Sequence, residues 1–236
     1  MPNHITNILT FDGPQEQIDA LLDAMKQEDK RGTLDFNKII PMPQSLDVTS
    51  GSVEDEALTA YLAAIDPFTP AYGEEKVSPK EYSQKLNMVL EKCHIFSGQR
   101  TLEVTPELIE QGKVYMGNIE LYGCTSWYEW SIEHWGTKWN SYSGDLINDN
   151  QITFLTAWSR PENIIHRLSE MYPDLTIEHS WADEDFGYNC GKAKYAAGGE
   201  IECYIPEGGT DEARDLASDI LGYEWEQEEE DELENE

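Results

Sequence analysis

Two stretches of this chain share a pattern that decides its fold. Residues 5–14 are ITNILTFDGP and residues 152–161 are ITFLTAWSRP. When the stretches are aligned, they are identical at Ile5 and Ile152, at Thr6 and Thr153, and at Pro14 and Pro161. In each stretch, apolar side chains occupy alternate positions, which is typical of a β-strand with one buried face. We therefore expect a strand at each stretch.

A helix is expected directly after each of these strands. Asp12 and Ser159 are the candidate N-caps, with a proline close behind and Gln15 or Glu162 three residues on. Apolar residues then recur at helical spacing and form one stripe on each helix. The stripes are Ile18, Leu21, Leu22 and Met25, and then Ile164, Ile165, Leu168 and Met171.

A further strand is expected after each helix, over residues 34–40 and 175–181. Two βαβ halves of this kind are the ingredients of a ferredoxin-like fold. The sequence therefore predicts an α+β protein with a ferredoxin-like core. A helix-rich insert separates the halves, and a hairpin and a helix follow them.

The expected insert and C-terminal elements follow from periodicity and capping residues. In the insert, helices are predicted over 53–65 and 79–96 and from Thr105 onward. The hairpin is predicted from 187–195 and 200–205, and the last helix runs from Thr210 to near Gly222.

These predictions divide the chain into four parts. Residues 1–50 form the first half of the core, and residues 51–140 form the insert, which ends in a tryptophan-rich helix. Residues 141–222 form the second half with the hairpin and helix. Residues 223–236 are an acidic tail that we expect to be disordered, because like charges at this density repel.

The balance of charge excludes several classes of partner. The chain has 16 Lys+Arg and 47 Asp+Glu, a net charge of −31, and the tail accounts for nine of the acids. A surface this negative repels phosphate backbones and anionic membranes. We therefore expect no direct nucleic-acid partner and no membrane association.

Cysteine usage and the apolar runs indicate a cytoplasmic protein. The four cysteines are scattered and form no CxxC pair. No apolar run has the length of a membrane helix, and the first residues do not have the pattern of a secretory signal.

The densest aromatic segment is residues 127–140, which hold four of the seven tryptophans. On one helix, an apolar stripe would consist of Leu121, Cys124, Tyr128, Ile132 and Trp135. One interpretation is that the rings pack against the sheet. The other is an exposed aromatic face for a partner or ligand. Under the second interpretation the binding residues are Trp127, Trp130, His134, Lys138, Trp139 and Asn140.

A second candidate lies in the acidic run Asp183, Glu184 and Asp185, which precedes Gly187. Carboxylates beside a glycine can bind a hard cation, but the spacing does not match an EF-hand loop. A turn with exposed acids is the other interpretation. We keep these three residues as candidates for partner or ligand binding.

Motifs for catalysis and cofactors give no assignment. No HExxH, Walker loop, GxGxxG or GxSxG pattern is present. We therefore predict no catalytic residue, no metal ligand and no cofactor.

Five segments together resemble a known family. They are residues 1–7 (MPNHITN), 36–43 (FNKIIPMP), 127–140, 156–161 (TAWSRP) and 187–191 (GYNCG). In this order they resemble the YubB ferredoxin-like family of plasmid and phage proteins. The resemblance implies a ferredoxin-like fold and a mobile-element origin, and it carries over no activity.

Two functions compete at this point. The first is a non-enzymatic module that binds a host protein with a basic surface, in counter-defence or as a nucleic-acid mimic. The second is a small-ligand binder or an enzyme whose site lies at the Trp127–Asn140 segment. There His134, Lys138, Asn140 and Asp185 would surround an aromatic pocket.

Overall fold

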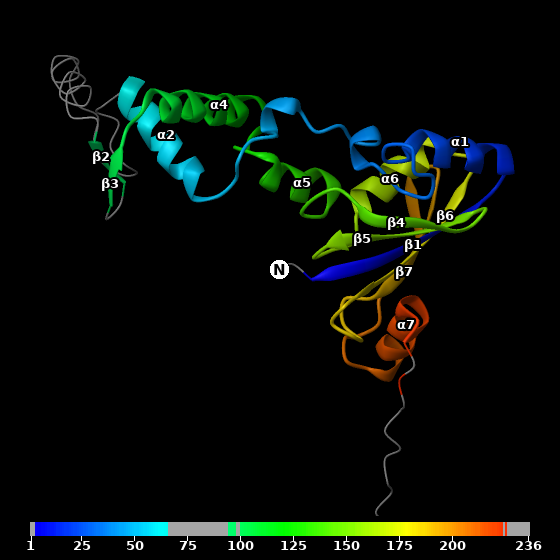
Figure 1. The fold of residues 1–236 in the computed structure, drawn as a ribbon. Helices are drawn as coiled ribbons and strands as arrows, with labels where there is room; N and C mark the ends of the chain where they lie inside the picture. Colours follow the sequence, from blue (N-terminus) through cyan, green and yellow to red (C-terminus); the bar gives the residue numbers. More distant parts are fainter. Residues whose placement is uncertain (1–2, 66–93, 98–99, 224, 226–236) are drawn as a thin grey trace, which may run out of the picture. The chain divides into compact units, whose positions relative to one another are not determined.

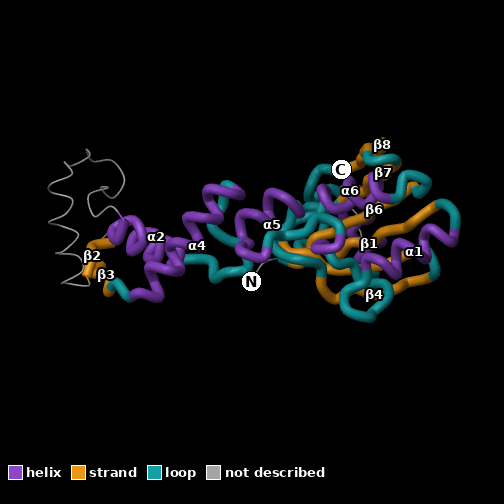
Figure 2. The backbone as a smooth tube through the Cα atoms, turned by 90° about the horizontal axis from the view of Figure 1, so that it is seen from above, coloured by secondary structure: helices purple, strands orange, loops and turns teal. Residues whose placement is uncertain are grey.

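A computed structural model describes residues 3–65, 94–97, 100–223 and 225. The chain divides into two compact units, drawn in Figures 1 and 2. The first unit combines Met1–Pro41 with Ser131–Glu236, and the second is Met42–Trp130. Among the described residues, no helix is both long and apolar enough to span a membrane.

The first unit is built on a six-stranded sheet in the order β4-β5-β1-β6-β7-β8. Every neighbouring pair is antiparallel. The strands are β1 (His4–Asp12), β4 (Tyr142–Asn148), β5 (Gln151–Ala157), β6 (Thr176–Asp183), β7 (Gly191–Ala196) and β8 (Gly199–Tyr204). The helices of this unit are α1 (Gln15–Met25), α6 (Glu162–Met171) and α7 (Asp211–Leu221).

Helices cover both faces of this sheet. Figure 1 shows α1 and α6 on one side and α7 on the other. On the α7 side, Ile8 and Ala182 pack with Ala213 and Ala217. The alternate positions of β1, including Leu9, therefore face α1 and α6, and they are fully buried. The strand alternation predicted for the two repeated stretches is confirmed in β1 and β5.

The strand predicted over residues 34–40 is wrong. Residues Phe36–Lys38 form a short 3₁₀ helix, η1, because local hydrogen bonds replace a strand ladder here. The backbone N–H of Asn37 donates to the Asp35 side chain, and that of Phe36 donates to Oδ1 of Asn140. The second strand of the core is instead β4, which comes after the insert.

With β4 in that place, the core elements follow the order β1-α1-β4-β5-α6-β6, and the strand order β4-β5-β1-β6 results. This βαββαβ arrangement is the ferredoxin-like pattern. The predicted fold class is confirmed, although the chain reaches it through a different second strand.

The predicted N-caps of the two core helices are also wrong. The caps are Pro14 and Pro161, and neither helix has a side-chain capping bond. The hydroxyl of Ser159 donates to the carbonyl of Gly136 instead.

The second unit contains η2 (Gln44–Leu46), α2 (Ser52–Ile65), β2 (His94–Ser97), β3 (Arg100–Glu103) and α4 (Pro106–Tyr122). The predicted α2 is confirmed, and so is the cap of α4, where Thr105 Oγ1 accepts from Leu108 N at 3.2 Å. Of the helix predicted over 79–96, residues 79–93 lie outside the described residues. Residues 94–96 belong to strand β2.

The tryptophan-rich segment does not form one helix with the turns before it. Helix α4 ends at Gly123, whose φ is +78°, and α5 (Trp127–Trp135) begins four residues later. The predicted stripe is therefore split, and Leu121 is 73% exposed. Trp130, predicted on the flank, is buried.

The hairpin and the last helix agree with their predictions. Strands β7 and β8 pair across a short turn. Helix α7 is capped by Thr210, whose Oγ1 accepts from Ala213 N at 3.3 Å, and it ends at Gly222 with φ +72°. Beyond it, Trp225 Nε1 donates to Asp215 Oδ1 at 3.2 Å.

Candidate functional site

Three loops meet at one end of the sheet in the first unit. The backbone N–H of Trp158, just after β5, donates to the Asn3 carbonyl at 3.0 Å. Asn189, between β6 and β7, donates through Nδ2 to the Trp158 carbonyl at 3.3 Å. Ser159 adds its hydroxyl bond to Gly136. Four of the five segments that carry the family resemblance therefore contact one another here.

The loop after β5 holds an unusual backbone conformation. Trp158 has φ +72°, in the left-handed region that bulky side chains rarely adopt. Such strain persists only where the surroundings impose it, and it concentrates at functional sites. The indole of Trp158 is 42% exposed. The loop thus presents a large ring to solvent from a fixed backbone.

A buried polar chain supports this loop from inside the sheet. His179 Nε2 lies 3.0 Å from Asn7 Oδ1. Asn7 Nδ2 donates to Thr156 Oγ1 at 2.9 Å, and Thr156 donates to the Ser159 carbonyl at 2.8 Å. The chain links β6, β1 and β5 to the loop. Its members are fully buried, so each bond replaces a lost bond to water.

Burial keeps His179 neutral. It lowers the pKa of His179 to about 3, and the positive charge of Arg160 acts in the same direction. Because the Asn7 amide group already donates to Thr156, the Nε2–H of His179 donates to the Asn7 oxygen. Among the described residues, Nδ1 of His179 has no hydrogen-bond partner.

Arg160 is the central cation of the site. Its guanidinium carbon lies 4.1 Å from the ring centroid of Trp181. Its Nη2 lies 2.8 Å from Glu162 Oε2 and 3.7 Å from Glu200 Oε2. Burial favours the neutral guanidine, but Tyr195, Glu162 and Cys203 outweigh it and raise the pKa of Arg160. Arg160 therefore remains charged.

A cleft of about 340 Å³ opens beside Arg160. Its lining includes Gly136, Ser159, Arg160, Trp181, Asn189 and Ile205. A second hollow, of about 370 Å³, lies over β6, β7 and β8 and contains the Lys194–Glu178 ion pair, with a 2.7 Å separation. The first cleft joins a fixed cation, the carboxylate of Glu162, an aromatic face and amides, so it suits a polar group better than an apolar one.

Three exposed apolar side chains belong to the segments that line this cleft. Trp158, Tyr188 (49% exposed) and Ile205 (59% exposed) form what we name the rim patch. Ile205 lines the cleft, and Asn189, which follows Tyr188, lines it and binds the Trp158 carbonyl. Exposed acids adjoin the patch in the chain at Glu184, Asp185 and Glu207.

The acidic run of the sequence prediction divides into one buried and two exposed residues. Asp183 is only 5% exposed and accepts from Asn3 Nδ2 at 3.1 Å and from Asn189 Nδ2 at 2.9 Å. Asp183 therefore links the N-terminal segment at Asn3 to the loop between β6 and β7 at Asn189. Glu184 and Asp185 are exposed and precede Tyr188 of the rim patch in the chain.

The predicted residues of the tryptophan-rich segment do not line the cleft. Asn140 Nδ2 donates to Asp35 Oδ1 at 2.8 Å, so it supports η1. Lys138 Nζ lies 4.5 Å from the Trp158 ring centroid and 4.8 Å from that of Trp139, which joins the segment to the rim patch. His134 is half-buried.

The other two predicted residues, Trp127 and Trp130, belong to the second unit. Trp127 is half-buried, and its ring contacts Tyr128 with a centroid separation of 5.7 Å. Trp130 is buried. For Trp130 the packing interpretation therefore describes the geometry better than the binding interpretation.

Sequence reasoning missed Arg160, Trp181 and Asn189 as a group. Each comes from a different loop or strand, so no local spacing joins them. The sequence feature that indicates this site is Arg160, which is one of 16 basic residues and lies near the end of the second repeated stretch, residues 152–161.

Comparison with known families agrees with this architecture. Residues 134–233 match the family model described as "Ferredoxin-like domain in Api92-like protein". This part of the chain is a ferredoxin-like domain. The matched part of the ferredoxin-like domain contains Arg160, Trp181 and Asn189, and therefore most of the cleft.

Comparisons with curated proteins and with solved structures give no functional assignment. No curated protein matches the chain. Among solved structures, the crystal structure of a protein api92 from Yersinia pseudotuberculosis is similar at 11% identity and a TM-score of 0.40. The match covers 89% of this chain and 100% of that one.

Proposed function

We propose that this protein is a non-enzymatic module that binds a host protein with a basic surface. The observation that carries the proposal is the rim patch, an exposed Trp, Tyr and Ile on the segments that line the cleft, in a chain with a net charge of −31. Tryptophan, tyrosine and arginine are the residues that most often dominate the binding energy of protein interfaces.

The backbone around the rim patch favours tight binding. Trp158 is fixed by the backbone bond to Asn3 and by the Asn189 bond to its carbonyl. A side chain on a fixed loop loses less conformational freedom on association. Lys138 also covers part of the Trp158 ring.

The charge around the patch favours a basic partner. Glu184 and Asp185 precede Tyr188 in the chain, Glu207 follows Ile205, and all three acids are exposed. Complementary charge speeds association and excludes partners with the wrong sign. Mimicry of a nucleic acid, with carboxylates in place of phosphates, is one form this binding would take.

The resemblance to the YubB family supports the biological setting of this proposal. A mobile element that enters a bacterial cell gains from a protein that blocks a host defence. In this setting the protein acts in the cytoplasm of the host.

A small-ligand site is the second candidate, because the cleft has the size of such sites. Ligand pockets commonly measure roughly 300–1,000 Å³, and this one is about 340 Å³. The site would be centred on Arg160 rather than on His134 and Asn140. A carboxylate-bearing ligand would then compete with Glu162 for the guanidinium.

The experiment is a pull-down from a bacterial lysate with the immobilised full chain, at low and at high salt. We expect a basic protein that is retained at low salt and released at high salt. Retention of nucleic acid instead of protein would contradict the proposal. If no protein is retained, the result would contradict the protein-binding proposal and favour the small-ligand site.

A further inference from the structure

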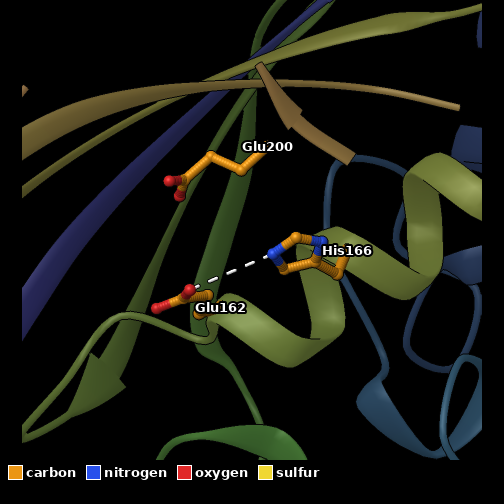
Figure 3. Close-up of side chains that lie close together, drawn as sticks. All are labelled: Glu162, His166 and Glu200. Carbon is orange, nitrogen blue, oxygen red and sulfur yellow. Dashed lines mark ion pairs between the residues drawn. The ribbon is translucent and has the colours of Figure 1, made fainter. Parts of the chain in front are cut away.

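Beside the cleft, three metal-binding side chains converge from two elements. Glu162 and His166 lie one turn apart on α6, and Glu200 lies on β8. Donor atoms of the three are all within 4.8 Å of one another. Figure 3 shows Glu162 and His166 on the same side of the helix, with Glu200 across from them on the strand.

We propose that Glu162, His166 and Glu200 bind a divalent transition-metal ion. Imidazole and carboxylate are standard ligands of Zn²⁺, at about 2.0–2.2 Å from the ion. A tetrahedral ion with such bonds separates neighbouring donors by about 3.3 Å. His166 Nε2 and Glu162 Oε1 are 3.9 Å apart, so small side-chain rotations bring them into range.

The contacts of His166 match those of a metal ligand. Its Nδ1 lies 3.4 Å from the Gly198 carbonyl. A histidine that binds metal usually donates its other ring N–H to a carbonyl or carboxylate, which fixes the tautomer. Here that arrangement leaves Nε2 as the free lone pair, on the side of Glu162. The ring also packs edge-on against Tyr195, with centroids 4.9 Å apart.

Glu200 has the same kind of support. The Tyr195 hydroxyl donates to Glu200 Oε2 at 3.2 Å. A hydrogen-bonded carboxylate is held in one orientation, as the carboxylate ligands of metal sites are.

Arg160 does not block the ion. Its Nη2 lies 2.8 Å from Oε2 of Glu162 and 3.7 Å from Oε2 of Glu200, whereas His166 lies near Oε1 of Glu162. The Oε1 atoms of the two carboxylates therefore remain for the ion. Three protein ligands leave a further position open to water or to an anion. The histidine favours Zn²⁺ and its neighbours over Mg²⁺ and Ca²⁺, which prefer oxygen ligands.

The test is calorimetric titration of the untagged full chain with Zn²⁺. We expect one tight equivalent in the wild type and at least tenfold weaker binding in His166→Ala and in Glu200→Gln. Far-UV circular dichroism establishes that each variant is folded. Since Glu200 is exposed, its variant remains informative if His166→Ala unfolds.

Two controls define the site. His134→Ala removes a histidine elsewhere, and Cys203→Ser removes the exposed thiol that lies 3.8 Å from Arg160 Nη1. Both variants should bind Zn²⁺ as the wild type does. Mg²⁺ should bind at least tenfold more weakly.

Three results with Zn²⁺ would overturn the proposal. They are an absence of stoichiometric Zn²⁺ binding, equal binding in His166→Ala, and loss of binding in Cys203→Ser. Equal affinity for Mg²⁺ would also overturn it, because the site would then be an acidic cluster only.

Discussion

At the scale of single residues, the site depends on polar side chains that are buried far from solvent. Asn7 is the central one, because it accepts from His179 and donates to Thr156. It lies on β1, under the loop that presents Trp158 and Arg160. Asn7 thus connects the interior of the sheet to the loop that carries Trp158 and Arg160.

Asn7→Ala should destabilise the protein by about 1–3 kcal/mol, because it leaves buried groups of His179 and Thr156 without partners. Urea unfolding followed by tryptophan fluorescence measures this. Gln15→Ala, an exposed change, should alter the free energy of unfolding by no more than about 0.5 kcal/mol. Equal effects of the two variants would show that the polar chain contributes nothing.

His179 should make stability depend on pH. Its folded pKa of about 3 lies below its ordinary value of 6.5, so the unfolded state takes up the proton first. This stabilising contribution is complete above about pH 6.5 and is lost as the pH falls toward 3. Between pH 7 and pH 5 the loss should be about 2 kcal/mol.

The measurement compares wild type with His179→Gln, which lacks the titrating ring. Other groups titrate in both proteins, so their contribution cancels in the difference. The wild type should lose more stability than the variant over this range. Parallel pH profiles would mean that His179 is not held neutral.

At the scale of elements, the repeated stretches were predictable because strand alternation and a helical stripe are local patterns. The same is true of the Thr105 and Thr210 caps. The second strand was not predictable in this way. Residues 34–40 have a strand-like composition, but β4 pairs with β5 across a short turn and occupies that edge of the sheet.

The candidate site was less predictable than the fold. Of the residues predicted for binding, Asp183 contacts Asn189 and Lys138 contacts the Trp158 ring. Arg160, Trp181 and Asn189 meet only through the register of β5, β1 and β6. Such register depends on the whole sheet, and no local motif encodes it.

Helix α4 provides a matched pair of glycines for a test of packing. A Cβ at Gly112 would lie 1.9 Å from the Ala57 carbonyl oxygen on α2, whereas nothing lies within 4 Å of one at Gly117. Gly112→Ala should therefore destabilise the second unit by about 1–3 kcal/mol. Gly117→Ala should stabilise it by about 0.5–1 kcal/mol.

Thermal unfolding, monitored by circular dichroism at the helix signal of 222 nm, measures the change in stability of both variants. Opposite shifts of the melting temperature are expected from this pair. Shifts of the same sign would show that the α2–α4 contact is not as close as described.

At the scale of the whole molecule, charge and the rim patch act together. The net charge of −31 disfavours phosphate-rich partners on physical grounds, and it does not specify a binding surface. In our proposal the rim patch is that surface, within the ferredoxin-like domain. Under this proposal, much of the charge would act at long range, where it would attract a basic partner and make binding depend on salt.

The most direct test of this account repeats the pull-down with surface variants. Trp158→Ser and Tyr188→Ser remove the rim patch, and Ile147→Ser removes an exposed apolar side chain on β4 as the matched control. We predict that the basic partner is retained by the wild type and by Ile147→Ser. At least tenfold less should be retained by each rim variant. Undiminished retention by Trp158→Ser and Tyr188→Ser would contradict the account.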